Sequence, residues 1–294
     1  MRGSRPAGGR VDPASRSEDE IENRHGGAGP VPGPGKLTVV GLGPGDPALT
    51  APLAVQALTD AGVVAGYSTY LDLIPAGLLA DKQIVSTGMM GEVARCNAAI
   101  DAALSGNDTV VVSSGDAGVY GMAGLVLELL EARGLLEAVE FEVVPGIPAV
   151  MGAAALLGAP LTHDFACVSL SDLLTPWELI EKRLEAAAGA DFVLALYNPR
   201  SRRRSGLLKK ALAIIARHRA PQTPVGIVRQ AWREGQSVQV ATLESADPEA
   251  VDMLTIVVVG NSQTRTASGR MLTPRGYAGK YGLGGESRKI ASAP

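Results

Sequence analysis

From residue 36 onward, short apolar runs alternate with longer segments in which apolar residues recur at helical spacing. The short runs are typical of buried strands, and the longer segments are typical of amphipathic helices. Strands are predicted at 36–43, 109–113 and 139–144, and helices at 50–66, 93–106 and 123–134. In the first helix, Thr50 is a candidate cap and Pro52 occupies the first turn. This order predicts a parallel or mixed sheet with helices on its faces.

The same alternation starts again after residues 157–162. It predicts strands at 165–172, 191–201, 223–231 and 253–262, and helices at 175–189 and 205–218. We therefore predict an α/β protein with two consecutive α/β domains, at 36–160 and 161–262.

The two ends of the chain lack this pattern. Residues 1–35 are rich in Gly, Pro, Arg, Ser and Glu and contain few apolar residues, so we expect a disordered tail. Residues 263–294 are typical of loop, and we expect this C-terminal extension to leave the core.

Composition narrows the class of protein. The chain has 294 residues, of which 46% are hydrophobic, so it has enough apolar material for a core. A net charge of -3 and an aromatic content of 4% argue against nucleic acid as a partner. Without a long apolar run or a secretory signal, we expect a cytoplasmic protein that does not contact membranes. Cys96 and Cys167 form no pattern typical of metal ligands, so no metal site is predicted.

The turn after the first predicted strand, GLGPGD at 41–46, resembles a phosphate-binding loop only in part. A dinucleotide-binding turn needs a third glycine where this chain has Asp46, and Pro44 removes a backbone N–H that an anion site would use. The turn therefore suits a neutral or cationic ligand. The alternative is a tight turn in which the Asp46 side chain bonds its own backbone.

Two further turns have similar chemistry. The turn SSGDAGVYG at 113–121 again combines glycines with an aspartate, Asp116, and VPGIPA at 144–149 contains a Pro-Gly pair. In an open α/β sheet, ligands bind beyond the carboxyl ends of the strands. We therefore expect the two Gly-Asp turns and the Pro-Gly turn to line one crevice without a phosphate-binding element. A ligand with a sulfonium and an adenine would suit this crevice. A nucleotide-dependent oxidoreductase and a binding protein without catalysis remain as alternatives.

The sequences of these three turns resemble those of the tetrapyrrole methylases, which use S-adenosylmethionine in corrin and sirohaem synthesis. LYNPRS, TPVGIVRQAWREGQ, MLTIVVVGNSQTR and MLTPRGY add to the resemblance, which covers roughly residues 36–277. It is strongest to the branch that methylates C17 of precorrin-3B, with ring contraction to precorrin-4, or its cobalt-containing counterpart. The resemblance implies a tetrapyrrole substrate, a cofactor cleft between two α/β domains, and a homodimer.

The resemblance also implies site residues. The cofactor contacts of the family fall on Pro44, Ser114, Gly115, Asp116, Val119, Pro148, Ala149, Asn198, Val228 and Thr255. Many relatives have Met at the position of Asn198, Ala at that of Thr255 and Pro at that of Ala117. Side-chain contacts at these positions can therefore differ from those of the family.

Methyl transfer from a sulfonium needs positioning rather than a protein nucleophile. Ring contraction requires a proton to be removed, and His163, beside Asp164, is the candidate acid or base; the alternative is a loop histidine bonded to backbone. Asp46 is a second candidate catalytic carboxylate. Arg200 and Arg202 are expected to meet substrate carboxylates, and Tyr120 is expected to face the ring.

Overall fold

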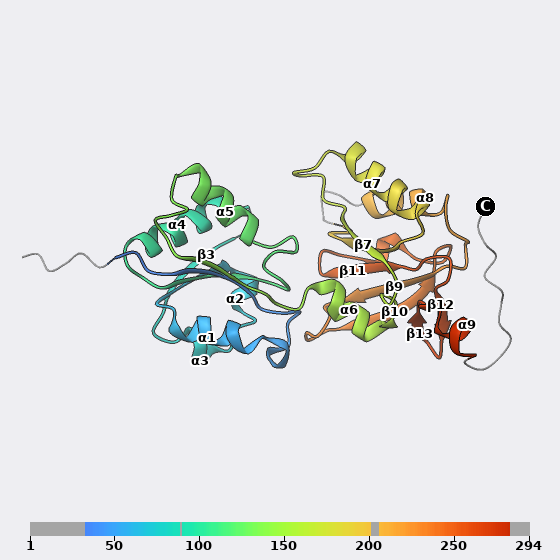
Figure 1. The fold of residues 1–294 in the computed structure, drawn as a ribbon, viewed down its shortest axis with the longest axis horizontal. Helices are drawn as coiled ribbons and strands as arrows, with labels where there is room; N and C mark the ends of the chain where they lie inside the picture. Colours follow the sequence, from blue (N-terminus) through green and yellow to red (C-terminus); the bar gives the residue numbers. More distant parts are fainter. Residues whose placement is uncertain (1–32, 89, 201–205, 283–294) are drawn as a thin grey trace, which may run out of the picture. The chain divides into compact units, whose positions relative to one another are not determined.

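The computed structural model describes residues 33–88, 90–200 and 206–282 (Figure 1). Its first sheet is parallel throughout, with the strand order β3-β2-β4-β1-β5. The strands are β1 (Leu37–Gly41), β2 (Val63–Tyr67), β3 (Gln83–Thr87), β4 (Thr109–Ser113) and β5 (Phe141–Val144). Because β1, β4 and β5 are neighbours that run in the same direction, the turns that follow them meet at one edge of the sheet.

Helices cover both faces of this sheet. Helices α4 (Glu92–Leu104) and α5 (Ala123–Ala132) share a core with the side chains of Val39 and Val111 on one face. On the other face, Val40 and Val112 pack with α1 (Pro52–Asp60), α2 (Ser68–Leu71) and α3 (Ala76–Leu79). The two covered faces explain why β1 and β4 are apolar runs without alternation.

The second sheet is mixed, with the order β10-β9-β11-β8-β7. Its strands are β7 (Phe165–Ser169), β8 (Val193–Tyr197), β9 (Pro224–Arg229), β10 (Ser237–Thr242) and β11 (Thr255–Val259). Only the pair β7–β8 is parallel within this sheet. Helices α7 (Trp177–Gly189) and α8 (Leu207–Ile215) cover one face, and α6 (Ala149–Leu157) packs on the other. The predicted α/β fold class is confirmed.

Some predicted boundaries were wrong. The helix expected at 50–66 ends at Asp60, and Val63–Tyr67 forms the buried strand β2. Thr50 does not cap this helix, because its hydroxyl donates to the carbonyl of Leu42. The strands β3 and β10 and the helix α6 were missed. β3 and β10 lie at sheet edges and are largely exposed, so they lack the apolar signal of a buried strand.

The end of the chain does not leave the core as expected. Strands β12 (Arg265–Ala267) and β13 (Arg270–Leu272) form a hairpin, and a short helix, α9 (Tyr277–Tyr281), follows. β13 pairs in parallel with β6 (Gly158–Ala159), and Met271 and Thr273 are completely buried. Met271 packs in the same cluster as α6 and the second sheet. The expected tail at 1–35 falls almost entirely outside the described residues, as does 283–294.

We expect Met271→Ala to lower the free energy of unfolding by about 2–4 kcal/mol, because it leaves a cavity in a packed core. Met90, which is 84% exposed, provides the control. Met90→Ala should change stability by less than about 0.5 kcal/mol. Denaturant titrations of both variants make the comparison. Equal stabilities would show that the C-terminal hairpin does not pack in the core.

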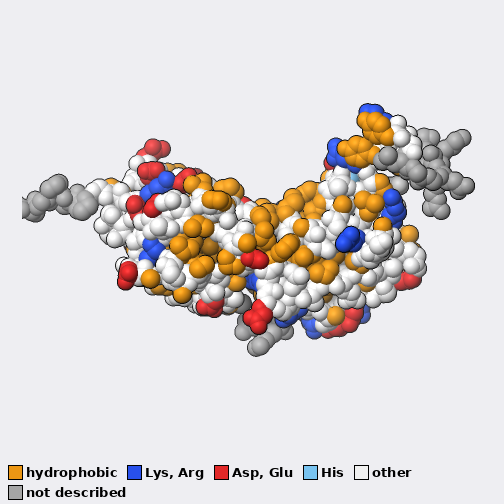
Figure 2. All heavy atoms as spheres, turned by 90° about the horizontal axis from the view of Figure 1, so that it is seen from below, with side chains coloured by type: hydrophobic (Ala, Val, Ile, Leu, Met, Phe, Trp, Pro, Cys, Tyr) orange, Lys and Arg blue, Asp and Glu red, His pale blue; other side chains and the backbone are white. Residues whose placement is uncertain are grey.

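The surface and the helices add two observations. On the face drawn in Figure 2, acidic and basic side chains of the described residues are interspersed, in keeping with the small net charge. A search of the helices in the described part of the chain finds none that is both long and apolar enough to cross a membrane.

Candidate active site

Three turns converge at the carboxyl edge of the first sheet. The turns after β1 and β4 are joined by reciprocal hydrogen bonds between Gly43 and Gly115, with N···O distances of 3.0 and 2.8 Å. The backbones pack so closely that a side chain on Gly41 or Gly146 would overlap the Gly115 carbonyl. Gly43 and Gly115 have φ angles of +78° and +68°, which favour glycine. The prediction that the three glycine-containing turns lie together is confirmed.

Asp116 holds two of these turns together. Its Oδ1 atom accepts hydrogen bonds from the N–H groups of Gly118 and Val119, at 2.8 and 3.0 Å. Its Oδ2 atom accepts a bond from Gly146 N–H at 3.0 Å, which links the second turn to the Pro-Gly turn. The charge of Asp116 is thus stabilised by backbone donors within the site.

The side chain of Asp46 bonds within its own turn. Its carboxylate accepts a hydrogen bond from Ala48 N–H at 2.9 Å and caps the short 3₁₀ helix Pro47–Leu49. This is the local bonding that was the alternative to a ligand-binding turn. Asp46 is not among the residues that line the cavity described next.

A cavity of about 190 Å³ lies where these turns meet the second sheet. From the first half of the chain it is lined by Pro44, Tyr70, Ser114, Gly115, Asp116, Val119, Tyr120 and Ala149. From the second half it is lined by Tyr197, Asn198, Val228, Gln230, Ala231, Arg233, Met253, Leu254, Thr255 and Ile256. Every residue expected to contact the cofactor lines this cavity except Pro148, which lies at the N-cap of α6.

Strand pairing explains how the second sheet contributes. β9 and β11 are antiparallel, so Val228 at the end of β9 lies opposite Ile256 at the start of β11. β11 is also antiparallel to β8, which ends at Tyr197 and is followed by Asn198. The end of β8, the end of β9 and the start of β11 therefore share one sheet edge, and that edge lines the cavity.

Two tyrosines connect the halves of the site. The rings of Tyr120 and Tyr197 lie 5.0 Å apart and are tilted by 56°. The Tyr120 hydroxyl donates to the carbonyl of Cys167 and accepts from Ser169 N–H, both at 3.1 Å. The Tyr197 hydroxyl accepts from Val150 N–H at 3.0 Å. Burial raises the pKa of both phenols, so they are neutral hydrogen-bonding groups at physiological pH.

Unusual backbone conformations are concentrated around the cavity. Tyr120, Asn198 and Gln230 line it and have φ angles of +53°, +52° and +48°. A positive φ is uncommon outside glycine and is an outlier for a bulky residue such as tyrosine. Such conformations cluster at ligand-binding and catalytic sites, where the surrounding structure holds them in place.

Asp252 organises the loop that lines one wall of the cavity. Its Oδ1 atom accepts from Leu254 N–H at 2.9 Å and from the Thr255 hydroxyl at 2.8 Å, and Arg229 Nε donates to Oδ2 at 2.8 Å. Burial by itself raises the pKa of Asp252, but these hydrogen bonds outweigh it and hold the pKa below its usual value. The stabilisation is therefore present above about pH 4 and is lost as the pH falls through the lowered pKa.

From this shift we expect Asp252→Asn to lower the free energy of unfolding by about 1 kcal/mol at pH 7, a modest value because the side chain is partly exposed. The difference from wild type should shrink as the pH falls below about 4 and vanish once the pH lies well below the lowered pKa of Asp252. Urea titrations across this range test it, with Asp81→Asn on the exposed surface as control. A difference independent of pH would show that the Asp252 charge does not act in the folded state.

No pattern in the sequence marks Arg233 as a site residue. Its Nε donates to the carbonyl of Pro44 and its Nη2 to the Ser114 hydroxyl, both at 2.7 Å, across 189 residues in the first case. The neighbouring Trp232 donates from Nε1 to the carbonyl of Gly152 at 2.9 Å. No local pattern marks such long-range contacts, so Arg233 was missed together with Gln230.

The structure does not bring two other predicted residues, His163 and Arg200, to the cavity. His163 precedes β7 and does not line the cavity, whereas Ser169 at the other end of that strand lies beside the cavity residue Tyr197. His163 Nδ1 accepts from Asp164 N–H at 2.8 Å, which is the loop role that was the alternative. Arg200 pairs with the carboxylate and carbonyl of Glu249, each at 2.6 Å. Arg202 lies outside the described residues.

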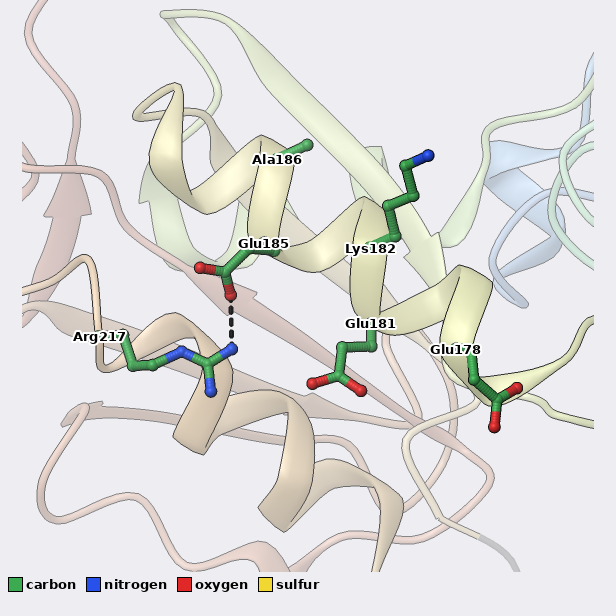
Figure 3. Close-up of a pocket in the computed structure, with 6 residues that line it drawn as sticks. All are labelled: Glu178, Glu181, Lys182, Glu185, Ala186 and Arg217. Carbon is green, nitrogen blue, oxygen red and sulfur yellow. Dashed lines mark hydrogen bonds and ion pairs between the residues drawn. The ribbon is translucent and has the colours of Figure 1, made fainter.

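A second hollow lies on the surface of α7 and α8 (Figure 3). It is lined by Glu178, Glu181, Lys182, Glu185, Ala186 and Arg217. Arg217 and His218 each bond the Glu185 carboxylate at 2.6 Å, and these bonds lower its pKa. Such charge pairs on an exposed surface are common and contribute little to stability or binding. The cavity between the turns is therefore the candidate active site.

The fold and this cavity define a class of protein: an α/β enzyme that binds a small molecule at adjoining edges of two sheets. Within the described ranges, no cluster of His, Cys, Asp and Glu side chains could hold a metal ion. A family model described as "Tetrapyrrole (Corrin/Porphyrin) Methylases" matches residues 36–247. The chain belongs to this family, which confirms the resemblance seen in the sequence, and it is a methyltransferase.

Two relatives have informative names. A protein of Salmonella typhimurium named "Probable cobalt-factor III C(17)-methyltransferase" is 51% identical over 82% of this chain and 99% of its own length. A protein of Sinorhizobium sp. named "Precorrin-3B C(17)-methyltransferase" is 38% identical over 83% of this chain and 98% of its own length.

Solved structures share the fold. The crystal structure of the methyltransferase CobJ has a TM-score of 0.78 and 40% identity, over 82% of this chain and all of that one. The uroporphyrin-III C-methyltransferase of Thermus thermophilus, in complex with S-adenosylhomocysteine, has a TM-score of 0.56 and 26% identity. It covers 77% of this chain and 92% of its own.

Proposed function

We propose that the chain transfers the methyl group of S-adenosylmethionine to C17 of a corrin precursor. One observation carries the proposal. The cavity joins three glycine-containing turns of the first sheet to the edge of the second sheet, and it is lined by nearly all the positions that the family uses for its cofactor. The names of two relatives, which specify C17, support this choice of reaction.

The cavity residues fit this cofactor. Close packing of the Gly43 and Gly115 backbones leaves main-chain groups near the ligand, and Val228, Ile256 and Ala149 provide apolar surface suited to an adenosine. No Walker-type phosphate loop follows β1, and Pro44 lacks an N–H, so the first turn is poorly suited to a pyrophosphate. When bound, the sulfonium of the cofactor supplies an electrophilic methyl group for in-line transfer to carbon. The uroporphyrin-III C-methyltransferase of Thermus thermophilus, which is similar to this chain, has been solved in complex with S-adenosylhomocysteine.

The protein's own contribution is positioning and exclusion of water. Asp116 holds the second turn and the Pro-Gly turn at a fixed separation, and Tyr120 ties the second turn to β7. A fixed site of this kind lowers the entropic cost of aligning the two reactants. The exposed ring of Tyr120 is the group we assign to the tetrapyrrole. The acid or base for ring contraction is not assigned to His163, because His163 does not line the cavity.

The two candidate substrates, cobalt-factor III and precorrin-3B, differ in whether they contain cobalt. The 51% identity to a relative named for cobalt-factor III, against 38% to one named for precorrin-3B, favours the cobalt-containing substrate. The family resemblance further implies a cytoplasmic homodimer, and this is part of the proposal.

The proposal is tested with purified protein. Calorimetry should detect binding of S-adenosylhomocysteine, and mass spectrometry should detect a tetrapyrrole that has gained one methyl group. Cobalt-factor III and precorrin-3B are each offered under air and without oxygen, and we expect the faster turnover with cobalt-factor III. Failure to bind S-adenosylhomocysteine, together with no methylated product from either substrate, would overturn the proposal.

A further inference from the structure

Arg233 leaves part of its guanidinium without a partner. The edge formed by Nε and Nη2 is used, because these atoms donate to Pro44 and Ser114. For the Nη1 amino group, the described part of the chain provides no hydrogen bond, and no ion pair to Arg233 occurs there. Burial lowers the pKa of Arg233, as expected for a cation removed from water without a carboxylate beside it. Arg233 lines the cavity.

The two charged side chains that line the cavity differ in how far their hydrogen-bonding groups are used. The charged residues that line it are Asp116 and Arg233, and the carboxylate of Asp116 is already stabilised by three backbone N–H groups. Burial raises the pKa of Tyr70, and the positive charges of Arg233 and Arg95 act in the opposite direction, so both cations lie near this phenol. Tyr67 and the carboxylate of Glu92 act against the two arginines, and Arg233 is the charge with the largest effect on Tyr70.

Arg95 adds an independent observation. Its side chain is only 3% exposed, and it hydrogen-bonds the Thr87 hydroxyl and the sulfur of Met122. Its Nε has no hydrogen-bond partner among the residues that the structure describes. A buried cation without a carboxylate is costly and contributes a positive potential to its surroundings. Arg95 thus acts on Tyr70, which lines the cavity, although Arg95 itself does not line it and Glu92 acts in the opposite direction.

We propose that Arg233 binds a carboxylate of a bound ligand through the free Nη1 end of its guanidinium, in the part of the cavity that Tyr70 also lines. The inference rests on the proposed function, which supplies two sources of this group. One source is the amino-acid portion of the cofactor, and the other is an acidic side chain of the tetrapyrrole. A planar guanidinium matches the geometry of a carboxylate and forms strong, charge-assisted hydrogen bonds with it.

The first turn is shaped to accommodate Arg233. Gly45 has a φ of +147°, and a side chain there would overlap the aliphatic part of Arg233. Gly45→Ala should therefore displace the guanidinium while keeping its charge. This provides a second variant that does not remove the arginine.

The test compares Arg233→Gln with wild type in binding two adenosine compounds. S-Adenosylhomocysteine carries the amino-acid carboxylate, whereas 5′-methylthioadenosine lacks the whole amino-acid portion. If the carboxylate comes from the cofactor, Arg233→Gln weakens S-adenosylhomocysteine about 10- to 100-fold, the range for a lost charged hydrogen bond, and leaves methylthioadenosine unchanged. Gly45→Ala should give the same pattern with a smaller change.

If the carboxylate comes from the tetrapyrrole, both adenosine compounds bind the variant as they bind wild type. The KM for the tetrapyrrole then rises about 10- to 100-fold, with kcat within about threefold. Equal weakening of both adenosine compounds would overturn the inference, because it is the result expected if Arg233 only holds the first turn. Unchanged binding together with an unchanged KM would overturn it as well. Failure of the wild type to bind S-adenosylhomocysteine would count against the proposed function instead.

Discussion

Replacing Gly115 with valine is expected to abolish binding of S-adenosylhomocysteine, a loss of at least about 100-fold, while the circular dichroism spectrum stays native. Gly115 has a φ of +68°, and a Cβ there would sit 3.5 Å from Ala149 N, at ordinary contact distance. The backbone therefore has room for a Cβ, but the two methyl groups of valine would extend into the region that the cavity occupies. The same substitution strains the Gly43–Gly115 bridge that joins the two turns.

Gly134 provides a matched control for the backbone strain. Its φ is +66°, nearly the same as that of Gly115, and a Cβ there would meet no atom of the described structure within 4 Å. It follows α5, away from the cavity residues. Both variants should lose about 1–2 kcal/mol of stability from the left-handed backbone, but Gly134→Val should keep wild-type affinity. Calorimetric titration beside a melting curve makes the comparison. Wild-type affinity in Gly115→Val would place the cofactor elsewhere.

Asp116→Ala is expected to lower the free energy of unfolding by about 2–4 kcal/mol and to weaken S-adenosylhomocysteine by at least about 30-fold. The substitution removes the acceptor for three backbone N–H groups at once, from Gly118, Val119 and Gly146. Water can replace the acceptor for the exposed Gly118 and Val119, so the main effect on binding comes from losing the link to Gly146. Asp116→Asn should be intermediate, because its amide presents a donor on one side where the carboxylate accepts.

Asp247 is the matched control for this variant. Its carboxylate accepts one hydrogen bond, from Glu249 N–H at 2.8 Å, and caps the 3₁₀ helix Pro248–Ala250, which lies outside the cavity lining. Asp247→Ala should cost about 0.5–2 kcal/mol, the usual range for a lost cap, without a change in affinity. Thermal melts and calorimetry on both proteins decide the matter. If the two variants lost stability and affinity equally, Asp116 would be an ordinary turn residue.

The sequence was most informative where local chemistry and burial agree. Runs such as Leu37–Gly41 and Thr109–Ser113 are buried on both faces, so apolar composition alone identifies them as strands. The glycines and aspartates that follow these strands have a local reason to be there, because turns that require a positive φ favour glycine. Their meeting at one edge then follows from parallel pairing.

Elements at the edges were harder to predict for a physical reason. β3 and β10 are exposed edge strands, and their residues have no need of an apolar pattern. The hairpin at Arg265–Leu272 is mostly polar and exposed, and only Met271 marks its contact with the core. Two adjacent apolar residues, Met271 and Leu272, in a largely polar segment are too weak a signal to predict a packed strand.

By itself, the sequence determined the α/β class, the strand-and-turn units that build the site, and the family, because these depend on local residue types in a fixed order. Only the tertiary structure decided which side chains act together. In the structure, His163 lies before β7 and outside the cavity lining, and the side chain of Asp46 caps a 3₁₀ helix. It also brought Arg233 to Pro44 across 189 residues. Contacts between distant segments depend on how the sheets pair and pack, and no local pattern encodes them.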